Sequence, residues 1–440
     1  MNAQQHDVLI IGGGISGSAL LYLLSRYTDL KSIGLIEKYD SIAALNSHGR
    51  NNSQTLHCGD IETNYTLDKA IKVKAGAAMV AKYALQSAKR DQLIFKYPKM
   101  VLGVGEEECN FLQARFEKFS PHFPHMQCLE QDGIAGIEPH VTAGRTERIL
   151  GLATQDQYTT VNFQALADAF IADAKASAGK TVNTYLNTRV DAIEQTDKEF
   201  LVRTNHGNLR ARFVVVSAGG HSLLFAQRMG YGKDYACLPV AGSFYFTPQV
   251  LNGKVYTVQK EKLPFAAVHG DPDILVPGKT RFGPTALILP MLERHNCRTI
   301  PEFFEVFSFG KGVRGVMWDL FKDSEIRAYM LRNVLFEIPV VREHLFVDDV
   351  RKIVPKIQRS DLEFANRIGG VRPVMIDKPN RKLHLGEAKV NPGNGIIFNM
   401  TPSPGATSCL QNGEQDMRSI ATHLGCQILE ELLTSELRNL

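Results

Sequence analysis

The sequence lacks any apolar run close to the 18 or more residues that a membrane-spanning helix needs. Its N-terminus also lacks the basic stretch and following apolar segment of a secretory signal; residues 1–6 are a short polar lead-in. Hydrophobic residues make up 44% and charged residues 22% of the 440 residues, as in ordinary soluble globular proteins. We therefore expect a cytoplasmic protein with two or three domains' worth of core.

Cysteine clusters and strong charge are also lacking. The seven cysteines are scattered, with no CxxC pair and no Cys/His group at zinc-binding spacing, so we expect no metal site. An odd, dispersed set fits a reducing cytosol. The net charge of +4 does not suggest a nucleic-acid partner, although it is compatible with an anionic membrane surface or anionic substrates.

A glycine motif near the N-terminus is the strongest signal present. The apolar run 8–11 leads into a turn, and a second apolar run, 33–36, ends in Glu37 and Lys38. The turn consists of Gly12, Gly13, Gly14, Ile15, Ser16 and Gly17. Such a strand, turn, helix and acid-ended strand form a dinucleotide-binding unit, in which Gly12 permits the turn, Gly14 admits a pyrophosphate and Gly17 brings the helix close. Glu37 would hold both ribose hydroxyls and repel a 2′-phosphate, which favours FAD or NAD over NADP.

A second turn of small residues lies near the C-terminus. The predicted strand 395–400 precedes Pro404, Gly405, Ala406 and Thr407, and a helix follows to about residue 424. The apolar strand 213–217 runs into Ala218 and Gly219, which leave room for a cofactor, although an ordinary β-to-α turn is the alternative there. A late strand–turn–helix suits a flavoprotein, because a helix N-terminus can stabilise charge on the flavin ring.

One further glycine pattern is interpreted differently. Residues 310–315 match GxGxxG, but Lys311 and Arg314 lie inside the pattern and no acid-ended strand follows at the required distance. We expect a surface turn there, before a helical stretch over 318–329.

The remaining patterns predict an α/β fold with an α+β substrate domain. Helices are expected over 66–89 and 161–176, and strands over 99–104, 188–194, 200–204 and 209–217. A Rossmann-like FAD-binding domain would comprise 1–90, 148–228 and 366–440. The substrate-binding domain, with a mostly antiparallel sheet, would comprise 91–147 and 229–365.

Several stretches together resemble the malate:quinone oxidoreductase family, over nearly the whole chain. They include the glycine turn, 52–57, 62–66, 238–246, 264–272, 281–286, 370–373 and 399–407. The resemblance implies FAD, (S)-malate as donor, oxaloacetate as product, hydride transfer to flavin N5 and a membrane quinone as acceptor. It also implies cofactor contacts for Ser53, Gln54 and Val190. The stretches 52–57 and 281–286 are also similar to L-2-hydroxyglutarate oxidases and dehydrogenases, which leaves the donor acid open.

Oxidation of a 2-hydroxy acid needs a base for the hydroxyl proton and cations for the carboxylates. His269, which follows an apolar segment, is the candidate base, and His57 in the polar loop 41–65 is its competitor. Arg281 and Arg372 are candidate clamps, since a guanidinium binds a carboxylate through two parallel hydrogen bonds and two clamps suit a dicarboxylate. Gln54 and Tyr256 are weaker candidates for polar substrate contacts.

The electron acceptor should bind without a nucleotide motif of its own, which fits a quinone. Without a membrane-spanning segment, the protein would then lie on the inner face of the plasma membrane. Candidate contacts are the basic and apolar stretch 310–318 and the C-terminal helix around 424–437. Two alternatives stay open, namely a flavoenzyme for 2-hydroxyglutarate or lactate and a non-catalytic flavin-binding module.

Overall fold

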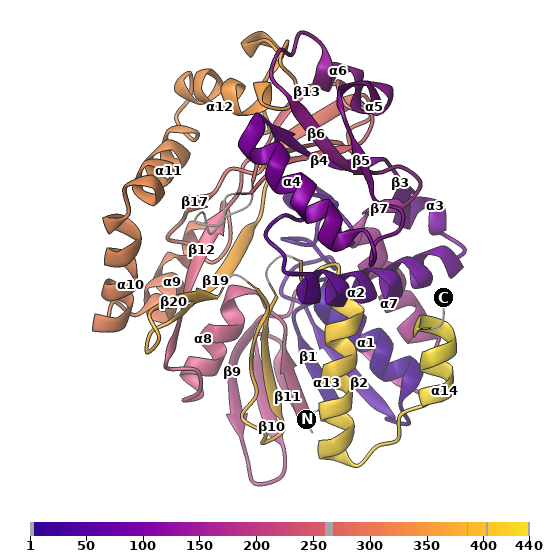
Figure 1. Cartoon of the computed structure of the whole chain (residues 1–440). Helices are drawn as coiled ribbons and strands as arrows, with labels where there is room; N and C mark the ends of the chain where they lie inside the picture. Colours follow the sequence, from indigo (N-terminus) through magenta and orange to yellow (C-terminus); the bar gives the residue numbers. More distant parts are fainter. Residues whose placement is uncertain (1–3, 260–266, 385, 402–403, 439–440) are drawn as a thin grey trace.

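The computed structural model describes residues 4–259, 267–384, 386–401 and 404–438. A mainly parallel sheet lies at the bottom of Figure 1, and a second unit with antiparallel sheets lies above it. The predicted α/β fold class is confirmed.

The parallel sheet carries the N-terminal glycine turn. Its strands lie in the order β8 (Thr181–Tyr185), β2 (Ser32–Ile36), β1 (Gln4–Ile11), β11 (Gly207–Val216) and β22 (Ile396–Met400), with β21 (Ala388–Val390) antiparallel at the edge. Strands β9 (Val190–Gln195) and β10 (Phe200–Thr204) join β11 in an antiparallel meander. The predicted apolar strand 213–217 corresponds to the end of β11 and lies between β1 and β22, where both of its faces are covered.

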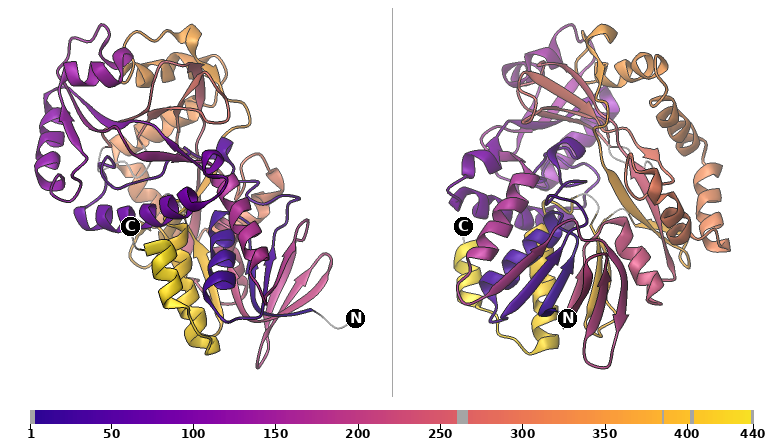
Figure 2. Two further views of the ribbon diagram at one scale, coloured as in Figure 1. Left: turned by 90° about the vertical axis from the view of Figure 1, so that its right-hand side faces the viewer. Right: turned by 180° about the vertical axis from the view of Figure 1, so that it is seen from behind.

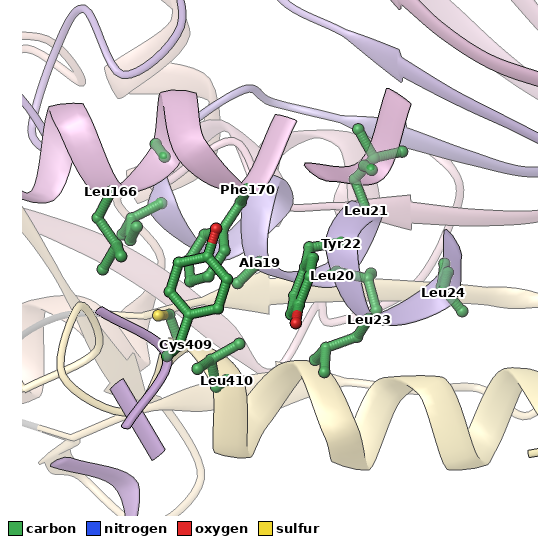
Figure 3. Close-up of a cluster of buried hydrophobic side chains, with 14 of the residues drawn as sticks. Ala19, Leu20, Leu21, Tyr22, Leu23, Leu24, Leu166, Phe170, Cys409 and Leu410 are labelled. Atoms are coloured by element: carbon green, nitrogen blue, oxygen red, sulfur yellow. The ribbon is translucent and has the colours of Figure 1, made fainter. Parts of the chain in front are cut away.

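Helices cover both faces of this sheet. Helix α1 (Ile15–Tyr27) packs between α7 (Phe163–Ala176) and α13 (Cys409–Leu424), as Figure 3 shows. The rings of Tyr22 and Phe170 stack there with centroids 5.4 Å apart. Helices α2 (Leu67–Gln86), α3 (Arg90–Leu93) and α14 (Glu430–Leu433) lie on the same side, and α8 (Gly220–Arg228) lies on the other. Because alternate residues of β1 face opposite sides, Val8 and Ile10 belong to one core and Leu9 to the other.

The second unit contains an eight-stranded sheet and a four-stranded sheet. The first has the order β18 (Glu363–Phe364), β13 (Tyr245–Pro248), β16 (Lys279–Gly283), β15 (His269–Pro272), β14 (Lys254–Thr257), β4 (Lys99–Val104), β6 (Ile149–Thr154) and β5 (Gln127–Leu129), antiparallel except for β14 with β4. The second has the antiparallel order β17 (Leu287–Ile288), β12 (Tyr235–Ala241), β19 (Val371–Asp377) and β20 (Lys382–His384). Strands β3 (Ile94–Lys96) and β7 (Tyr158–Val161) form a separate pair. Helices α4 (Glu106–Phe119), α5 (Gln131–Ile137) and α6 (Pro139–Thr142) complete this part.

Three strands bear on the predicted domain boundaries. The boundaries assign β6, β19 and β20 to the FAD-binding domain, whereas their hydrogen bonds place them in the sheets of the second unit. The division of the chain into domains stays a prediction.

Four helices follow one another along one flank of the second unit: α9 (Ile300–Phe307), α10 (Lys311–Lys322), α11 (Ser324–Leu335) and α12 (Val341–Arg351). The surface turn expected at 310–315 is therefore wrong. Gly312 and Gly315 lie within α10, where an added Cβ would meet Lys378 at 2.8 Å and Arg381 at 3.1 Å. These glycines let the turn between β19 and β20 pack closely on the helix. The helix expected over 318–329 is divided at Asp323, whose side chain accepts the first N–H groups of α11.

Within the described residues, no helix combines the length and apolar character needed to cross a bilayer. The C-terminal segment considered as a membrane contact packs inward only in part, since Leu429 is 44% exposed. Leu433 and Leu437 are both buried in the core around α1.

Gly17 offers a test of the packing between α1 and β1. A Cβ at this position would lie 2.0 Å from the backbone oxygen of Gly12. Gly17→Ala is therefore expected to cost about 1–3 kcal/mol of folding free energy through overpacking, although alanine normally favours a helix by about 1 kcal/mol. The urea midpoint of unfolding measures this effect. Gly136→Ala in α5 is the control, because a Cβ there meets nothing within 4 Å. An equal midpoint for Gly17→Ala and the natural protein would contradict the packing argument.

Candidate active site

A cavity of about 370 Å³ lies at the carboxyl ends of the parallel strands. Both turns of small residues contribute to its wall. Of the predicted cofactor and site residues, it is lined by Gly12, Gly14, Ile15, Ser16, Glu37, Lys38, Ser53, His57, Val190, Ala218, Gly219, Arg372, Pro404, Ala406 and Thr407. The other predicted residues are not part of the lining, namely Gly13, Gly17, Gly405, Gln54, Tyr256, His269 and Arg281.

The N-terminal turn is pressed against the end of β11. Gly12 has a φ of +111°, and a Cβ on it would lie 2.4 Å from the backbone oxygen of Ser217. Gly14 occupies the N-cap of α1 and has no side chain to occupy the space at the helix end. The backbone N–H of Ile15 donates to Ser47 Oγ over 3.0 Å. Gly14, Ile15 and Ser16 line the cavity, so the partial positive charge at the N-terminus of α1 faces it, as a diphosphate site requires.

Glu37 closes the other end of the nucleotide unit. Its carboxylate accepts hydrogen bonds from the N–H groups of Gly13, at 2.8 Å, and Tyr39, at 3.0 Å. Burial raises the pKa of Glu37, which the two N–H donors partly offset. Next to it, Lys38 pairs with Glu293, and Tyr39 donates to the same carboxylate over 2.6 Å. The second unit thus supplies a carboxylate, that of Glu293, which binds the two residues that follow Glu37 in the chain.

The two turns, nearly 400 residues apart in the chain, meet in space. Ser16 Oγ and Thr401 Oγ1 are 3.2 Å apart, and the N–H of His57 donates to Thr407 Oγ1 over 3.0 Å. The end of α13 therefore faces the same cavity as the end of α1. A glycine cradle, an acidic residue at the end of β2 and two converging helix ends fit FAD.

His57 lies in the cavity wall beside the second turn. Its Nδ1 is 2.9 Å from Glu62 Oε1, and both side chains are largely buried. Burial would raise the pKa of Glu62, but the hydrogen bond with His57 and the charge of Lys99 help to lower it. A neutral imidazole that donates from Nδ1 to an ionised carboxylate carries its lone pair on Nε2. The pair can therefore accept a proton and stabilise the imidazolium that results.

Arg372 projects from β19 into the cavity wall. Its guanidinium makes no hydrogen bond or ion pair with any described residue. Burial lowers the pKa of Arg372, and the nearby Tyr256, Tyr329 and Tyr65 offset part of this effect. Because a cation that is half-buried and has no ionic partner is only partly solvated, this guanidinium is suited to an anionic ligand.

His269 is placed differently from His57. It lies on β15 directly opposite Tyr256 on β14, and the two rings stack with centroids 4.3 Å apart. Its Nε2 is 3.3 Å from Asp271 Oδ2, without the alignment of a hydrogen bond. Burial opposes ionisation of Asp271, but Lys254, His269 and Arg281 outweigh it and hold its pKa well below the usual range. Only 3% of His269 is exposed, and the ring does not reach the cavity wall.

Arg281 and Gln54 organise the loop that carries His57. The guanidinium of Arg281 donates to the backbone oxygens of Gly49 and Asn52 and pairs with Asp273 at 3.2 Å. Gln54 donates to the same Gly49 oxygen and to Asp273. Both side chains are fully buried, so the structure does not bring Arg281 and Arg372 together as two clamps in the cavity wall.

Tyr256 has an intermediate position. Its hydroxyl is 2.7 Å from Thr55 Oγ1, which lines the cavity, and burial raises its pKa well above the usual value. Tyr256 stacks on the buried His269 and also lies near Arg372.

Glu62, Tyr65 and Tyr329 are neighbours of the site that were not among the predicted site residues. Glu62 carried a signal, because it is an acid five residues after a candidate base in the same polar loop. Tyr329 carried none, since α11 reaches the site only through tertiary packing.

Comparisons with known proteins agree with this geometry. A family model described as malate:quinone oxidoreductase matches residues 4–411. A probable malate:quinone oxidoreductase of Campylobacter jejuni is 48% identical, with 99% of this chain and 100% of that protein covered. A malate:quinone oxidoreductase of Helicobacter pylori is 45% identical, with 96% of each covered.

Solved structures show the same fold at low sequence identity. An L-α-glycerophosphate oxidase from Mycoplasma pneumoniae with FAD bound has a TM-score of 0.66 at 19% identity, with 97% of this chain and 96% of that chain covered. A glycine oxidase from Geobacillus kaustophilus has a TM-score of 0.64 at 17% identity, with 95% of each covered.

Proposed function

Because this chain belongs to the malate:quinone oxidoreductase family, we propose that it oxidises (S)-malate to oxaloacetate with FAD and passes the electrons to a membrane quinone. The observation that carries this proposal is the cavity at the two converging turns, whose wall contains both the His57–Glu62 pair and the unpaired Arg372. When bound, FAD supplies the hydride acceptor.

Arg372 anchors a carboxylate of the substrate. Its guanidinium lines the cavity and has no ionic partner among the described residues, so a carboxylate gains a strong, directional ion pair there. Tyr65, Tyr256 and Tyr329 lie near the guanidinium. A fixed carboxylate orients the substrate's carbinol carbon for reaction.

His57 accepts the hydroxyl proton. Its lone pair lies on Nε2 while Glu62 holds Nδ1, and the carboxylate stabilises the charge that the ring acquires. His269 remains the competing candidate. Its burial behind Tyr256 supports a positioning role, in which it fixes the ring of Tyr256 rather than meeting substrate. Arg281 and Gln54 hold the loop 49–57 in place.

The remaining predicted contacts hold the cofactor. Gly12, Gly14, Ile15 and Ser16 would face the diphosphate, and Glu37 and Val190 the adenosine, while Pro404, Ala406 and Thr407 would lie beside the ring system. Cytoplasmic localisation on the inner face of the plasma membrane follows from a quinone acceptor and belongs to the same proposal.

Anaerobic titration tests the proposal directly. The purified protein should be yellow and should bleach on addition of L-malate. Bleaching only with L-2-hydroxyglutarate or L-lactate would assign a different 2-hydroxy acid. A yellow protein that is indifferent to all three would indicate a non-catalytic flavin-binding module.

A further inference from the structure

Exposed apolar side chains gather on the flank formed by α9 to α12. Ten of the fifteen large hydrophobic residues that are exposed in the described part of the chain lie within 304–341. Figure 1 shows these helices along the left flank, and the view from behind in Figure 2 shows them on the right, at the edge of the molecule in both. Contiguous exposed apolar patches of this kind usually mark an interaction surface.

On helix α10 the exposed residues of this surface are regularly spaced. Arg314, Trp318 and Phe321 follow one another at helical spacing, and Lys311 and Lys322 flank Trp318 on the same face. Trp318 is 65% exposed and is the single tryptophan of the chain. The opposite face is buried through Val313 and Val316. We call the five exposed residues the α10 stripe.

The cations of the α10 stripe are available to an external anion. Lys311, Arg314 and Lys322 make no ion pair with any residue that the structure describes. The nearby acid Asp319 is paired with Arg381 at 2.8 Å. The stripe therefore combines aromatic rings with uncompensated positive charge.

The neighbouring helix α11 connects this surface with the active site. Its outer side exposes Leu331 and Val334. On its inner side Asn333 is buried and accepts the N–H of Ala286 over 2.6 Å, and Tyr329 lies near Arg372. A single helix thus separates the exposed apolar flank from the proposed substrate anchor.

We propose that the α10 stripe and the outer side of α11 rest on an anionic lipid bilayer. This inference depends on the proposed quinone acceptor, because it names the surface through which an apolar acceptor in the bilayer would be approached. Tryptophan and phenylalanine suit the interfacial zone of a bilayer, and lysine and arginine suit its anionic headgroups. A second copy of this chain fits less well, since a two-fold contact through the stripe would bring like charges together and interface cores are depleted in lysine.

Trp318 itself reports on the contact. The protein with bound FAD should show a blue shift of tryptophan emission with vesicles of phosphatidylcholine and phosphatidylglycerol, and a smaller shift with phosphatidylcholine alone. Added salt should weaken sedimentation with the mixed vesicles. Unchanged emission with the mixed vesicles at low salt would overturn the proposal.

Matched variants locate the surface. Phe321→Glu should reduce sedimentation with the mixed vesicles about tenfold or more, since it removes an exposed aromatic side chain that would enter the bilayer and adds a negative charge that the anionic lipid repels. Phe111→Glu is the control, because Phe111 is similarly exposed, at 39% against 44%, but lies on α4. Equal losses in both variants, or none in Phe321→Glu, would contradict the assignment. The double variant Lys311→Gln/Arg314→Gln provides a second test on exposed side chains. It should weaken binding to the mixed vesicles and leave binding to phosphatidylcholine vesicles unchanged.

The readouts separate this proposal from the proposed function. Phe321→Glu should keep the natural rate of bleaching by malate and of reduction of a water-soluble dye, while turnover with a long-chain quinone in vesicles falls. If malate fails to bleach the protein but the stripe still governs vesicle binding, the docking surface stands and the proposed function fails. A stable dimer in sedimentation equilibrium that Phe321→Glu dissociates would assign the surface to a second copy and overturn the proposal.

Discussion

His57→Gln is expected to slow the bleaching of the enzyme by malate about 10²- to 10⁴-fold, the usual contribution of a positioned general base. Glutamine preserves a polar side chain of similar reach but cannot take up a proton at neutral pH. The loss should therefore fall on the chemical step rather than on substrate binding. Anaerobic stopped-flow absorbance at saturating malate measures this rate without interference from the acceptor.

The matched control is His269→Gln. This side chain lies outside the cavity wall and contacts the site through Tyr256, so most of the rate should remain. The FAD content and melting temperature of both variants show whether either change acts through folding. A slow His269→Gln enzyme beside a His57→Gln enzyme of natural rate would transfer the role of base to His269.

Arg372→Ala is expected to cost about 2–4 kcal/mol of transition-state stabilisation, or about 30- to 1,000-fold in kcat/KM for malate. The reason is that the variant lacks the guanidinium that lines the cavity without an ionic partner among the described residues and would anchor a substrate carboxylate. Arg372→Lys should recover part of the loss, since an ammonium keeps the charge but not the paired hydrogen bonds. Steady-state kinetics with malate and a soluble dye measure both variants.

Stability distinguishes an anchor from a structural arginine. Removing the uncompensated charge of Arg372 should leave the melting temperature of the substrate-free enzyme unchanged or raise it. Arg281→Ala should instead lower the melting temperature, because it leaves Asp273 and the backbone oxygens of Gly49 and Asn52 without their donor. An unchanged kcat/KM in Arg372→Ala would remove this residue from the site.

The nucleotide-binding half of the site was predictable because its determinants are local. An apolar run, a glycine that tolerates a φ of +111° and an acid at the end of the next strand lie within the first 37 residues. Each has a physical requirement that few other residues meet. The second turn was likewise recognisable from small residues between an apolar strand and a helix.

The substrate half was less predictable, because residues of one type occupy unlike environments. His57 and His269 both looked suitable as bases. However, His269 is buried because β15 pairs between β14 and β16, while the loop after β2 carries His57 to the cavity. Arg281 and Arg372 both adjoin residues that restrict the backbone. The guanidinium of Arg281, however, is already bound by Asp273 and two backbone oxygens. Likewise, glycines in 310–315 suggested a turn, whereas the turn between β19 and β20 packs against them in a helix.

The sequence by itself determined the dinucleotide-binding unit, the alternation of strands and helices and the candidates for the chemistry, since each follows from periodicity or from the conformational needs of neighbouring residues. Only the tertiary structure decided which histidine and which arginine reach the cavity and which apolar residues stay exposed along α9 to α12. The physical reason is that burial and ion pairing depend on segments hundreds of residues apart, and no local pattern records which of them meet.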